Sequence, residues 1–366
     1  MKLTAYDIYR FRLPLARPLR LKEGTVAFRE GSLVRLRAAD GQAGWGEVAP
    51  LPGFSAETLV AAEADLARVI NTLGREVWPD EPAALLRALG VWMDVLDSLP
   101  SVRFGLELAM MNLSAASRGE HLPSALSHRA RSSIPVNALI MDDADLEAET
   151  DRVQAGGYGV IKLKVGRRPV ARDVERVLRV RARLGPDVSL RLDANRAWDP
   201  PTARAFADGV CGARVVYVEE PLVDPAGLGD LAARTGLPVA LDETMPGLDP
   251  KALSEHRYAR AVVLKPTLCG GLTKTLRLAA AATALGMTPV LSSAFESGVG
   301  TLGVAALAAC AGSEETAAGL DTYRRFREDV LELPLTLSSR ISVADLWGAP
   351  HRVRPDALET IAGGRL

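Results

Sequence analysis

Charged residues stand at matching positions in four successive segments of the chain. The segments LRLDAN, VYVEEP, VALDET and VVLKP each run from apolar residues to a charged one, in turn Asp193, Glu219, Asp242 and Lys265. The separations are 26, 23 and 23 residues, each about the length of one strand, one helix and their connections. Because neighbouring parallel strands end at the same edge of a sheet, we expect these four side chains to converge.

Three of the four are carboxylates, and repulsion between like charges makes such a cluster costly unless a cation lies among them. Magnesium prefers carboxylate oxygen and keeps positions open for water or substrate. We therefore predict that Asp193, Glu219 and Asp242 hold Mg²⁺, with Mn²⁺ as a substitute. One acidic residue at a strand end more often caps a helix, but three in consecutive segments favour a metal site. Strand alternation should turn Glu220 and Glu243 away from it.

Two lysines share one face of the segment VIKLKVG, residues 160–166. Its apolar residues alternate with Lys162 and Lys164, which is the two-residue period of a strand. A lysine pair on a strand usually lies on a solvated sheet face, but both faces of a strand are covered in a parallel barrel. We expect Lys162 and Lys164 to flank the metal on one side and Lys265 to flank it on the other.

A divalent metal between lysines suits proton removal next to a carboxylate. The α-proton is very weakly acidic, and its removal requires cations that stabilise the enediolate. A neutral lysine must accept the proton, so its pKa must fall from the reference value of about 10.4. Burial beside a metal and other ammonium groups lowers the pKa of a lysine.

The elements that must position these residues begin near residue 133, where short apolar strands alternate with helices. Seven or eight strand-helix units in roughly 190 residues predict an α/β fold, a modified (β/α)7–8 TIM-type barrel. Their strands lie in the segments IPVNALIM, VIKLKVG, VSLRLDAN, VVYVEEPL, PVALDET, AVVLKPT, TPVLSSAFES and, more weakly, AAGLDTY. The active site should lie at the carboxyl ends of these strands.

The rest of the chain differs in pattern from the barrel. Alternation and turn signals at the start predict a small antiparallel sheet, and helical periodicity follows it. We therefore predict an α+β capping domain at residues 1–120 and the barrel at residues 121–325. Residues 326–366 are predicted to form a C-terminal segment that packs back on the capping domain.

Composition narrows the partners. The formal net charge is −1 and no dense basic block occurs, which argues against nucleic acid and anionic membranes and favours a small-molecule carboxylate substrate. The first residues of the sequence alternate between apolar and polar like a strand, and no apolar run is long enough to cross a bilayer. We therefore predict a cytoplasmic protein. The sequence leaves open whether the chain forms a homo-oligomer. The 3 cysteines form no CxxC pattern and are read as reduced thiols.

The charged motifs resemble those of the enolase superfamily, in its muconate-lactonizing branch. They are KxK at 162 and 164, LDAN, VEEPL, LDET and VLKPT. Further segments are similar to the o-succinylbenzoate synthase family of menaquinone biosynthesis, namely GWGEVAPLPGFSAET, PSVRFGLELA, RLDANRAW, VLKPTLCGGL, LSSAFES and GLDT. The resemblance covers both predicted domains and implies a metal-dependent lyase that dehydrates 2-succinyl-6-hydroxy-2,4-cyclohexadiene-1-carboxylate.

By this resemblance Lys164 is the base and then protonates the departing hydroxyl in a syn elimination. Lys265 stabilises the enediolate by its charge and a cation–π contact with the ring, and Lys162 supports the substrate carboxylate and lowers the pKa of Lys164. The substrate-binding positions that the resemblance implies are Arg191, Ser292, Ser293, Gly319, Leu51 and Phe295. Arg191 could instead serve only as a salt-bridge partner, and Ser292 and Ser293 could instead only close a turn.

Two other functions remain open at this point. With a lysine on each face of the substrate carbon, the same residues could racemise an N-succinylamino acid or epimerise a dipeptide. A different class of enzyme would use a lysine at a strand end as a Schiff base, as metal-independent aldolases do. Three clustered carboxylates have no purpose in that chemistry. A binding protein with a vestigial site is disfavoured because every expected charged position is filled.

Overall fold

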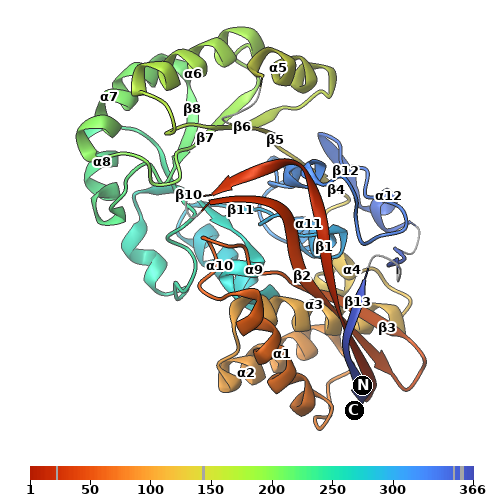
Figure 1. Cartoon of the computed structure of the whole chain (residues 1–366). Helices are drawn as coiled ribbons and strands as arrows, with labels where there is room; N and C mark the ends of the chain where they lie inside the picture. The colour runs from red at the N-terminus through yellow and green to blue at the C-terminus, as the bar shows by residue number, and fades with distance from the viewer. Residues whose placement is uncertain (22–23, 142–144, 349–350, 355–357) are drawn as a thin grey trace.

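The computed structural model describes the chain except residues 22–23, 142–144, 349–350 and 355–357. It consists of an N-terminal capping domain and a C-terminal parallel β/α barrel, which confirms the predicted fold class (Figure 1). The domain boundaries stay a prediction, and parts of the predicted C-terminal segment 326–366 lie outside the described residues.

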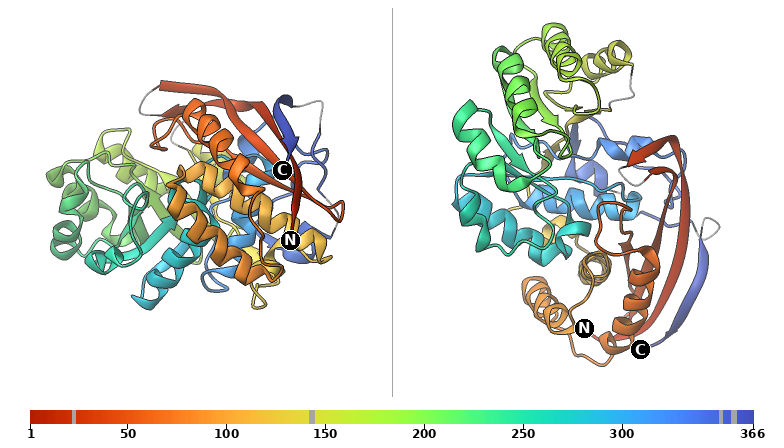
Figure 2. Two further views of the ribbon diagram at one scale, coloured as in Figure 1. Left: turned by 90° about the horizontal axis from the view of Figure 1, so that it is seen from below. Right: turned by 60° about the vertical axis from the view of Figure 1, so that its left-hand side comes forward.

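The capping domain is built on an antiparallel sheet with the strand order β13-β1-β2-β3. Its strands are β1 (Leu3–Leu21), β2 (Gly24–Ala38), β3 (Ala43–Val48) and β13 (Glu359–Arg365). Three helices follow: α1 (Leu59–Leu73), α2 (Pro82–Leu96) and α3 (Pro100–Ser117). Prolines at the starts of α2 and α3 suit the first helical turn, where an N–H has no partner within the helix. Pairing of β13 with β1 brings the two termini together (Figures 1 and 2).

The barrel sheet contains seven parallel strands among the described residues, in the order β11-β10-β9-β8-β7-β6-β5. They are β5 (Ala138–Ile140), β6 (Val160–Lys164), β7 (Ser189–Asp193), β8 (Val215–Glu219), β9 (Val239–Leu241), β10 (Ala259–Leu264) and β11 (Thr288–Leu291). The weak eighth unit supplies two isolated bridges, Ser292 to Gly319 and Val136 to Ala318. These bridges connect the two edges of the sheet.

Helices cover the outside of the barrel (Figure 2). They are α5 (Leu146–Ala155), α6 (Val170–Leu184), α7 (Pro200–Val210), α8 (Leu228–Thr235), α9 (Pro266–Cys269), α10 (Gly271–Ala284) and α11 (Gly298–Cys310). In α6 the spacing of Val177, Val180 and Leu184 buries one stripe, and Arg172, Arg179 and Arg183 are exposed on the other side. Between β9 and β10 the connection is a short 3-10 turn, Ala252–His256, instead of a full α-helix.

One predicted strand is divided in the structure. The segment IPVNALIM forms β4 (Ser133–Pro135) and β5, joined through Val136 and Asn137. Strand β4 pairs antiparallel with β12 (Arg340–Ser342), outside the barrel sheet. Both pieces are apolar and buried, so periodicity alone does not separate them. Two short helices, α4 (Leu122–Leu126) and α12 (Val343–Trp347), complete the chain.

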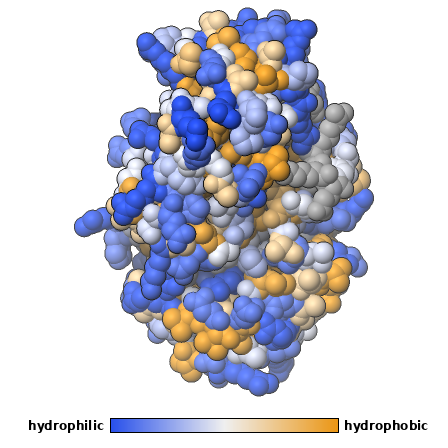
Figure 3. Space-filling model, turned by 90° about the vertical axis from the view of Figure 1, so that its left-hand side faces the viewer, coloured by the Kyte–Doolittle hydropathy of each residue, from blue (hydrophilic) through white to orange (hydrophobic). Residues whose placement is uncertain are grey.

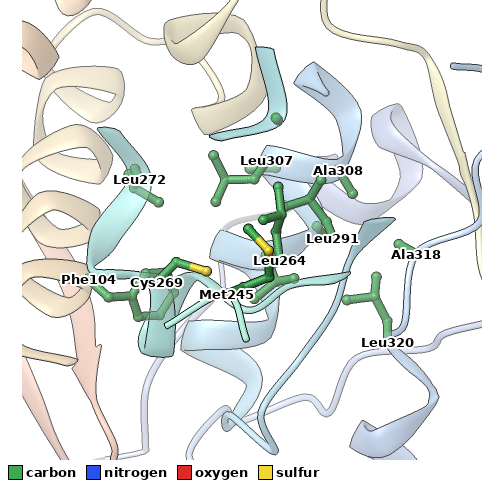
Figure 4. Packing of buried hydrophobic residues seen from close by; sticks show 14 of the residues in the cluster. Phe104, Met245, Leu264, Cys269, Leu272, Leu291, Leu307, Ala308, Ala318 and Leu320 are labelled. Carbon is green, nitrogen blue, oxygen red and sulfur yellow. The ribbon is translucent and has the colours of Figure 1, made fainter. Parts of the chain in front are cut away.

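Buried apolar side chains run continuously from the barrel into the capping domain. Figure 4 shows Leu264 of β10 and Leu291 of β11 facing residues of α10 and α11, with Phe104 of α3 beside Cys269. This shared core fixes how the capping domain sits on the barrel. The outer face in Figure 3 is mostly hydrophilic, with hydrophobic residues in separate groups. No described helix is both long and apolar enough to cross a bilayer.

Candidate active site

The strand register places Lys164, Asp193 and Glu219 side by side on three neighbouring strands of the barrel. Lys164 of β6 is paired with Asp193 of β7, and Asp193 is paired with Glu219 of β8. Asp242 follows the last residue of β9, and Lys265 follows the last residue of β10. All five residues therefore reach the same carboxyl-end mouth, as their sequence spacing predicts.

The three carboxylates form a compact buried group. One oxygen each from Asp193, Glu219 and Asp242 lies within 4.8 Å of the others. Their exposures are 0%, 1% and 2%, so solvent does not screen their mutual repulsion. Three buried carboxylate oxygens at this separation fit a divalent cation of the oxygen-preferring kind.

Each carboxylate is paired with a lysine ammonium group. Lys164 Nζ lies 2.6 Å from Asp193 Oδ2, and Lys265 Nζ lies 2.6 Å from Asp242 Oδ2. Lys162 Nζ lies 2.8 Å from Asp193 Oδ2 and also contacts Glu219. In this charged network, ion pairs join Lys162, Lys164, Asp193 and Glu219, and Lys265 and Asp242 form a further pair beside them.

The charges in this network change one another's pKa. Burial opposes ionisation of Asp193, but Lys162 and Lys164 outweigh it and hold the pKa of this carboxyl below its usual range. Burial raises the pKa of Glu219, and the charges of Asp193 and Asp242 add to that rise. Burial also opposes the charge of Lys162, but Asp193 and Glu219 keep its pKa well above the usual value.

The neighbouring acidic residues support the loops around the site. Glu220 accepts hydrogen bonds from the backbone of Asp242 at 3.0 Å and of Thr244 at 2.8 Å, so it holds the turn that carries a candidate metal ligand. Glu243 accepts a hydrogen bond from Asn195 at 2.9 Å. Strands β8 and β9 end at Glu219 and Leu241, so Glu220 and Glu243 belong to the loops that follow these strands.

A pocket opens above this network between the barrel and the capping domain. Lys162, Lys164 and Lys265 lie in its lining, together with apolar residues from both domains. The remaining described lining residues are Leu19, Leu51, Phe54, Asn137, Leu139, Met141, Val165, Arg167, Asn195, Ser292, Ser293, Ala294, Phe295, Gly319, Asp321 and Thr322. Charged groups at the base and an apolar wall suit a small carboxylate with a hydrophobic ring.

Both parts of the chain match known family models. Residues 145–351 match the model described as Enolase C-terminal domain-like, and residues 3–113 match MenC, N-terminal domain. An o-succinylbenzoate synthase from Klebsiella pneumoniae (strain 342) is 36% identical over 323 residues, which cover 86% of this chain and 90% of the relative. This chain belongs to the o-succinylbenzoate synthase family. That family assignment confirms the resemblance predicted from the motifs, together with the lyase class and menaquinone biosynthesis.

Solved structures outside this family share the fold. A muconate lactonizing enzyme from Pseudomonas fluorescens, complexed with muconolactone, matches with a TM-score of 0.83 and 24% identity, covering 97% of this chain and 98% of that one. The substrate-liganded L-Ala-D/L-Glu epimerase from Bacillus subtilis matches with a TM-score of 0.82 and 25% identity, covering 96% and 98%. The o-succinylbenzoate synthase family thus uses a framework that other reactions also use.

Two predicted substrate-binding positions meet at one point of the pocket. Ser292 and Gly319 are bridged between β11 and the eighth unit, and both line the pocket. A Cβ at position 319 would lie 2.4 Å from Ser292 Oγ, so a larger residue there would require the Ser292 side chain to shift. Leu51 and Phe295 also line the pocket, as expected for apolar walls.

The hydroxyl of Ser293 is engaged in a turn. It donates to Glu296 Oε2 at 2.6 Å and accepts a hydrogen bond from the backbone N–H of Phe295 at 3.1 Å. These contacts correspond to the plain alternative named for this serine. Its substrate role stays a prediction, and the observed contacts give Ser293 a part in shaping the turn that carries Phe295.

Arg191 points into the barrel interior. Its Nη1 donates to Asn137 Oδ1 at 3.2 Å and to the carbonyl of Ala317 at 2.8 Å, and its guanidinium lies 5.5 Å from the ring of Tyr217. The described lining of the pocket includes Asn137 but not Arg191. Arg191 therefore supports a lining residue, and it forms no salt bridge with the residues that the structure describes.

Two site residues were not singled out from the sequence. The Phe54 ring lies 5.2 Å from Lys265 Nζ, within cation–π range. Asn195 Oδ1 accepts a hydrogen bond from Lys164 at 2.7 Å. Asn195 lies in the LDAN motif and Phe54 in the PLPGFS segment, so both residues belong to motifs that the sequence analysis had already connected with the site. The partner of each residue required the folded structure.

Proposed function

We propose that this chain converts 2-succinyl-6-hydroxy-2,4-cyclohexadiene-1-carboxylate to 2-succinylbenzoate, with Mg²⁺ as its metal. The observation that carries the proposal is the placement of Lys164 and Lys265 around a buried group of three carboxylates, at the base of a pocket with an apolar wall. The o-succinylbenzoate synthase relatives supply the substrate class. Lys162, Lys164 and Lys265 are the proposed catalytic residues, and Asp193, Glu219 and Asp242 the proposed metal ligands.

Lys164 is the proposed acid and base. Its neutral amine removes the α-proton, and the electrons of the C–H bond pass into the enediolate of the substrate carboxylate. The C–O bond to the departing hydroxyl then breaks, and Lys164 returns its proton to that hydroxyl on the same face. Water leaves and the ring becomes aromatic. Asn195, 2.7 Å from Nζ, orients the lysine for both transfers.

The negative charge of the enediolate must be stabilised by nearby cations, because water does not screen it in a buried site. A divalent ion held by the three carboxylates supplies Lewis-acid charge there when bound. Lys162 and Lys265 add ammonium charge from β6 and from the end of β10, and these two residues are each 9% exposed. Phe54 keeps Lys265 beside the ring position by a cation–π contact.

The succinyl tail is proposed to lie between the barrel and the capping loop, the segment of the capping domain that contains Leu51 and Phe54. Ser292 and the backbone at Gly319 receive its polar groups, and Leu51 and Phe295 cover its methylene groups. Ser293 shapes the Phe295 turn, and Arg191 holds Asn137 in the lining. These positions bind the part of the substrate that does not react, so they govern KM more than the chemical step.

A second activity uses the same two lysines. Since Lys164 and Lys265 reach the pocket from different sides, one can remove a proton and the other can return it, which racemises an N-succinylamino acid. The solved structure with 25% identity is, by its title, an L-Ala-D/L-Glu epimerase, which inverts a carbon next to a carboxylate in a dipeptide. Racemisation is therefore the alternative proposal for this chain. A cytoplasmic location and homo-oligomer formation stay predictions.

The deciding experiment compares both reactions on one preparation. The purified protein with Mg²⁺ is assayed with the cyclohexadiene carboxylate and with a panel of N-succinylamino acids, each with a chelated control. Metal-dependent formation of the aromatic product, faster than racemisation, supports the dehydratase. Faster racemisation supports the alternative. Activity that survives the chelator would refute the metal-assisted mechanism in both.

A further inference from the structure

A buried arginine lies where the capping domain meets the pocket. Arg29, on β2, is only 2% exposed, although arginine is rarely buried without partners. Its guanidinium N–H groups donate hydrogen bonds to four backbone carbonyls. The acceptors are Phe295 at 3.0 Å, Glu30 at 2.9 Å, Pro50 at 2.8 Å and Ala49.

The four carbonyls belong to different parts of the fold. Ala49 and Pro50 lead directly into the capping loop that contains Leu51 and Phe54. Phe295 belongs to the barrel and lies 266 positions from Arg29 in the chain. One guanidinium therefore holds the start of the capping loop and a turn of the barrel in a fixed relation.

Both ends of this connection form one wall of the pocket. Leu51, Leu268 and Ala294 form a buried cluster against which Phe54 and Phe295 pack. Phe295 has φ +61°, a left-handed conformation that is uncommon for an aromatic residue and needs support from its surroundings. The hydrogen bond from Arg29 to its carbonyl provides such support.

The same wall reaches a proposed catalytic group. The loop itself is closed by hydrogen bonds from the backbone of Phe54 and Ser55 to the carbonyl of Leu51, at 3.0 Å and 2.8 Å. Its Phe54 ring lies 5.2 Å from Lys265 Nζ. Displacement of residues 49–50 would therefore move the aromatic ring that faces this lysine.

We infer that Arg29 is a positioning residue that fixes the capping loop and Phe295 as a preformed wall of the active site and, through Phe54, sets the place of Lys265. The kinetic part of this inference rests on the proposed dehydratase function, and the structural part does not. Since a buried Arg makes planar, multiply bonded contacts that Lys cannot copy, Lys should replace it only in part.

The test compares Arg29→Met and Arg29→Lys with a matched variant, Arg181→Met. Arg181 likewise donates to backbone carbonyls, of Ala213 at 2.8 Å, Gly185 at 2.6 Å and Val188 at 2.8 Å. These carbonyls precede the amino ends of β7 and β8, at the opposite end of the barrel from the pocket. Arg181→Met therefore controls for the loss of arginine–carbonyl bonds as such.

Two readouts are taken on metal-loaded protein. Steady-state kinetics with the cyclohexadiene carboxylate should show kcat/KM lower by about 100-fold in Arg29→Met, the scale expected from misplaced catalytic groups. In Arg29→Met, KM should rise and kcat should fall. The kinetic constants of Arg29→Lys should lie between those of Arg29→Met and those of the wild type. Amide hydrogen exchange should become faster in residues 49–58 and 293–297, and not elsewhere. Arg181→Met should change neither readout at these segments.

The outcomes separate the two claims. Unchanged exchange in residues 49–58 of either Arg29 variant overturns the inference, whatever the activity. Exchange that rises across the whole chain, as for a merely destabilised protein, also overturns it. Faster exchange confined to the two segments supports the structural part even if the wild type has no dehydratase activity. If Arg29→Met does not fold, Arg29→Lys alone decides by the same measurements.

Discussion

Lys164 Nζ lies 2.6 Å from Asp193 Oδ2, and the two residues are register partners on adjacent strands. The pairing of β6 with β7 thus sets a proposed base directly beside a proposed metal ligand. A carboxylate oxygen that holds a metal has less charge to give to a lysine, so a metal bound by Asp193 would weaken this ion pair.

Lys164→Ala should abolish dehydration with little change in fold. Removal of a general acid and base costs about 10²–10⁴-fold in rate, and this residue serves in both steps. The side chain is 21% exposed, so truncation leaves no deep cavity. Product formation followed by ultraviolet absorbance, with circular dichroism for the fold, checks the prediction. Lys251→Ala, at an exposed position, is the control; substantial activity in Lys164→Ala would assign the base elsewhere.

Lys265→Ala should separate the two candidate reactions. Racemisation needs a lysine on each face of the substrate carbon, so it should fall below detection. Syn dehydration needs an acid and base on one face only, so it should fall by the loss of one stabilising charge, about 10²–10³-fold. The loss of optical rotation from a single N-succinylamino acid enantiomer and the formation of the aromatic product measure the two reactions. Equal losses in both would show that Lys265 has the same role in each.

Asp242→Asn should weaken metal binding without unfolding the barrel. The change removes one charge from the three-carboxylate group while keeping the shape of a side chain that is 2% exposed. We expect metal affinity to fall by more than about 100-fold, since loss of outer-shell partners alone costs 10–100-fold. Titration with Mn²⁺ followed by electron paramagnetic resonance measures it. The control is Asp249→Asn, at an exposed position on the following turn; wild-type affinity in Asp242→Asn would remove Asp242 from the ligand set.

Glu107→Gln should alter how stability depends on pH. Burial raises the pKa of Glu107 to about 7, and its Oε1 has no hydrogen-bond partner among the described residues. Between about pH 4.5 and 7 the folded protein binds a proton that the unfolded chain releases, so this group destabilises the fold as pH rises through that window. Relative to wild type, Glu107→Gln should gain on the order of 2 kcal/mol between pH 5 and pH 8.

Urea unfolding at pH 5, 6, 7 and 8 gives this difference in the free energy of unfolding. Glu255→Gln, at an exposed position, serves as the matched control and should track the wild type throughout. A constant difference between Glu107→Gln and wild type across the four pH values would show that Glu107 is ionised in the folded protein at all of them. Its contact with the backbone N–H of Thr273, at 2.8 Å, would then be charge-assisted.

The reactive centre was predictable because it depends on local periodicity. The two-residue period places Lys162 and Lys164 on one face, and the strand-helix repeat brings Asp193, Glu219 and Asp242 to one edge. Both patterns relate residues in the same strand or in neighbouring strand-helix units, and the structure places each of these residues at the carboxyl-end mouth of the barrel. Periodicity did not separate β4 from β5, because both are short, apolar and buried.

The sequence by itself determined the barrel, the carboxylate group and the lysines around it. Only the tertiary structure decided that Arg29 bonds to Phe295, that Phe54 faces Lys265, that Ser293 closes a turn and that Arg191 points inward. Each of these contacts depends on where the capping domain docks or on which way one side chain turns in a packed interior. Such choices follow from the sum of many weak contacts between distant segments, which no spacing along the chain records.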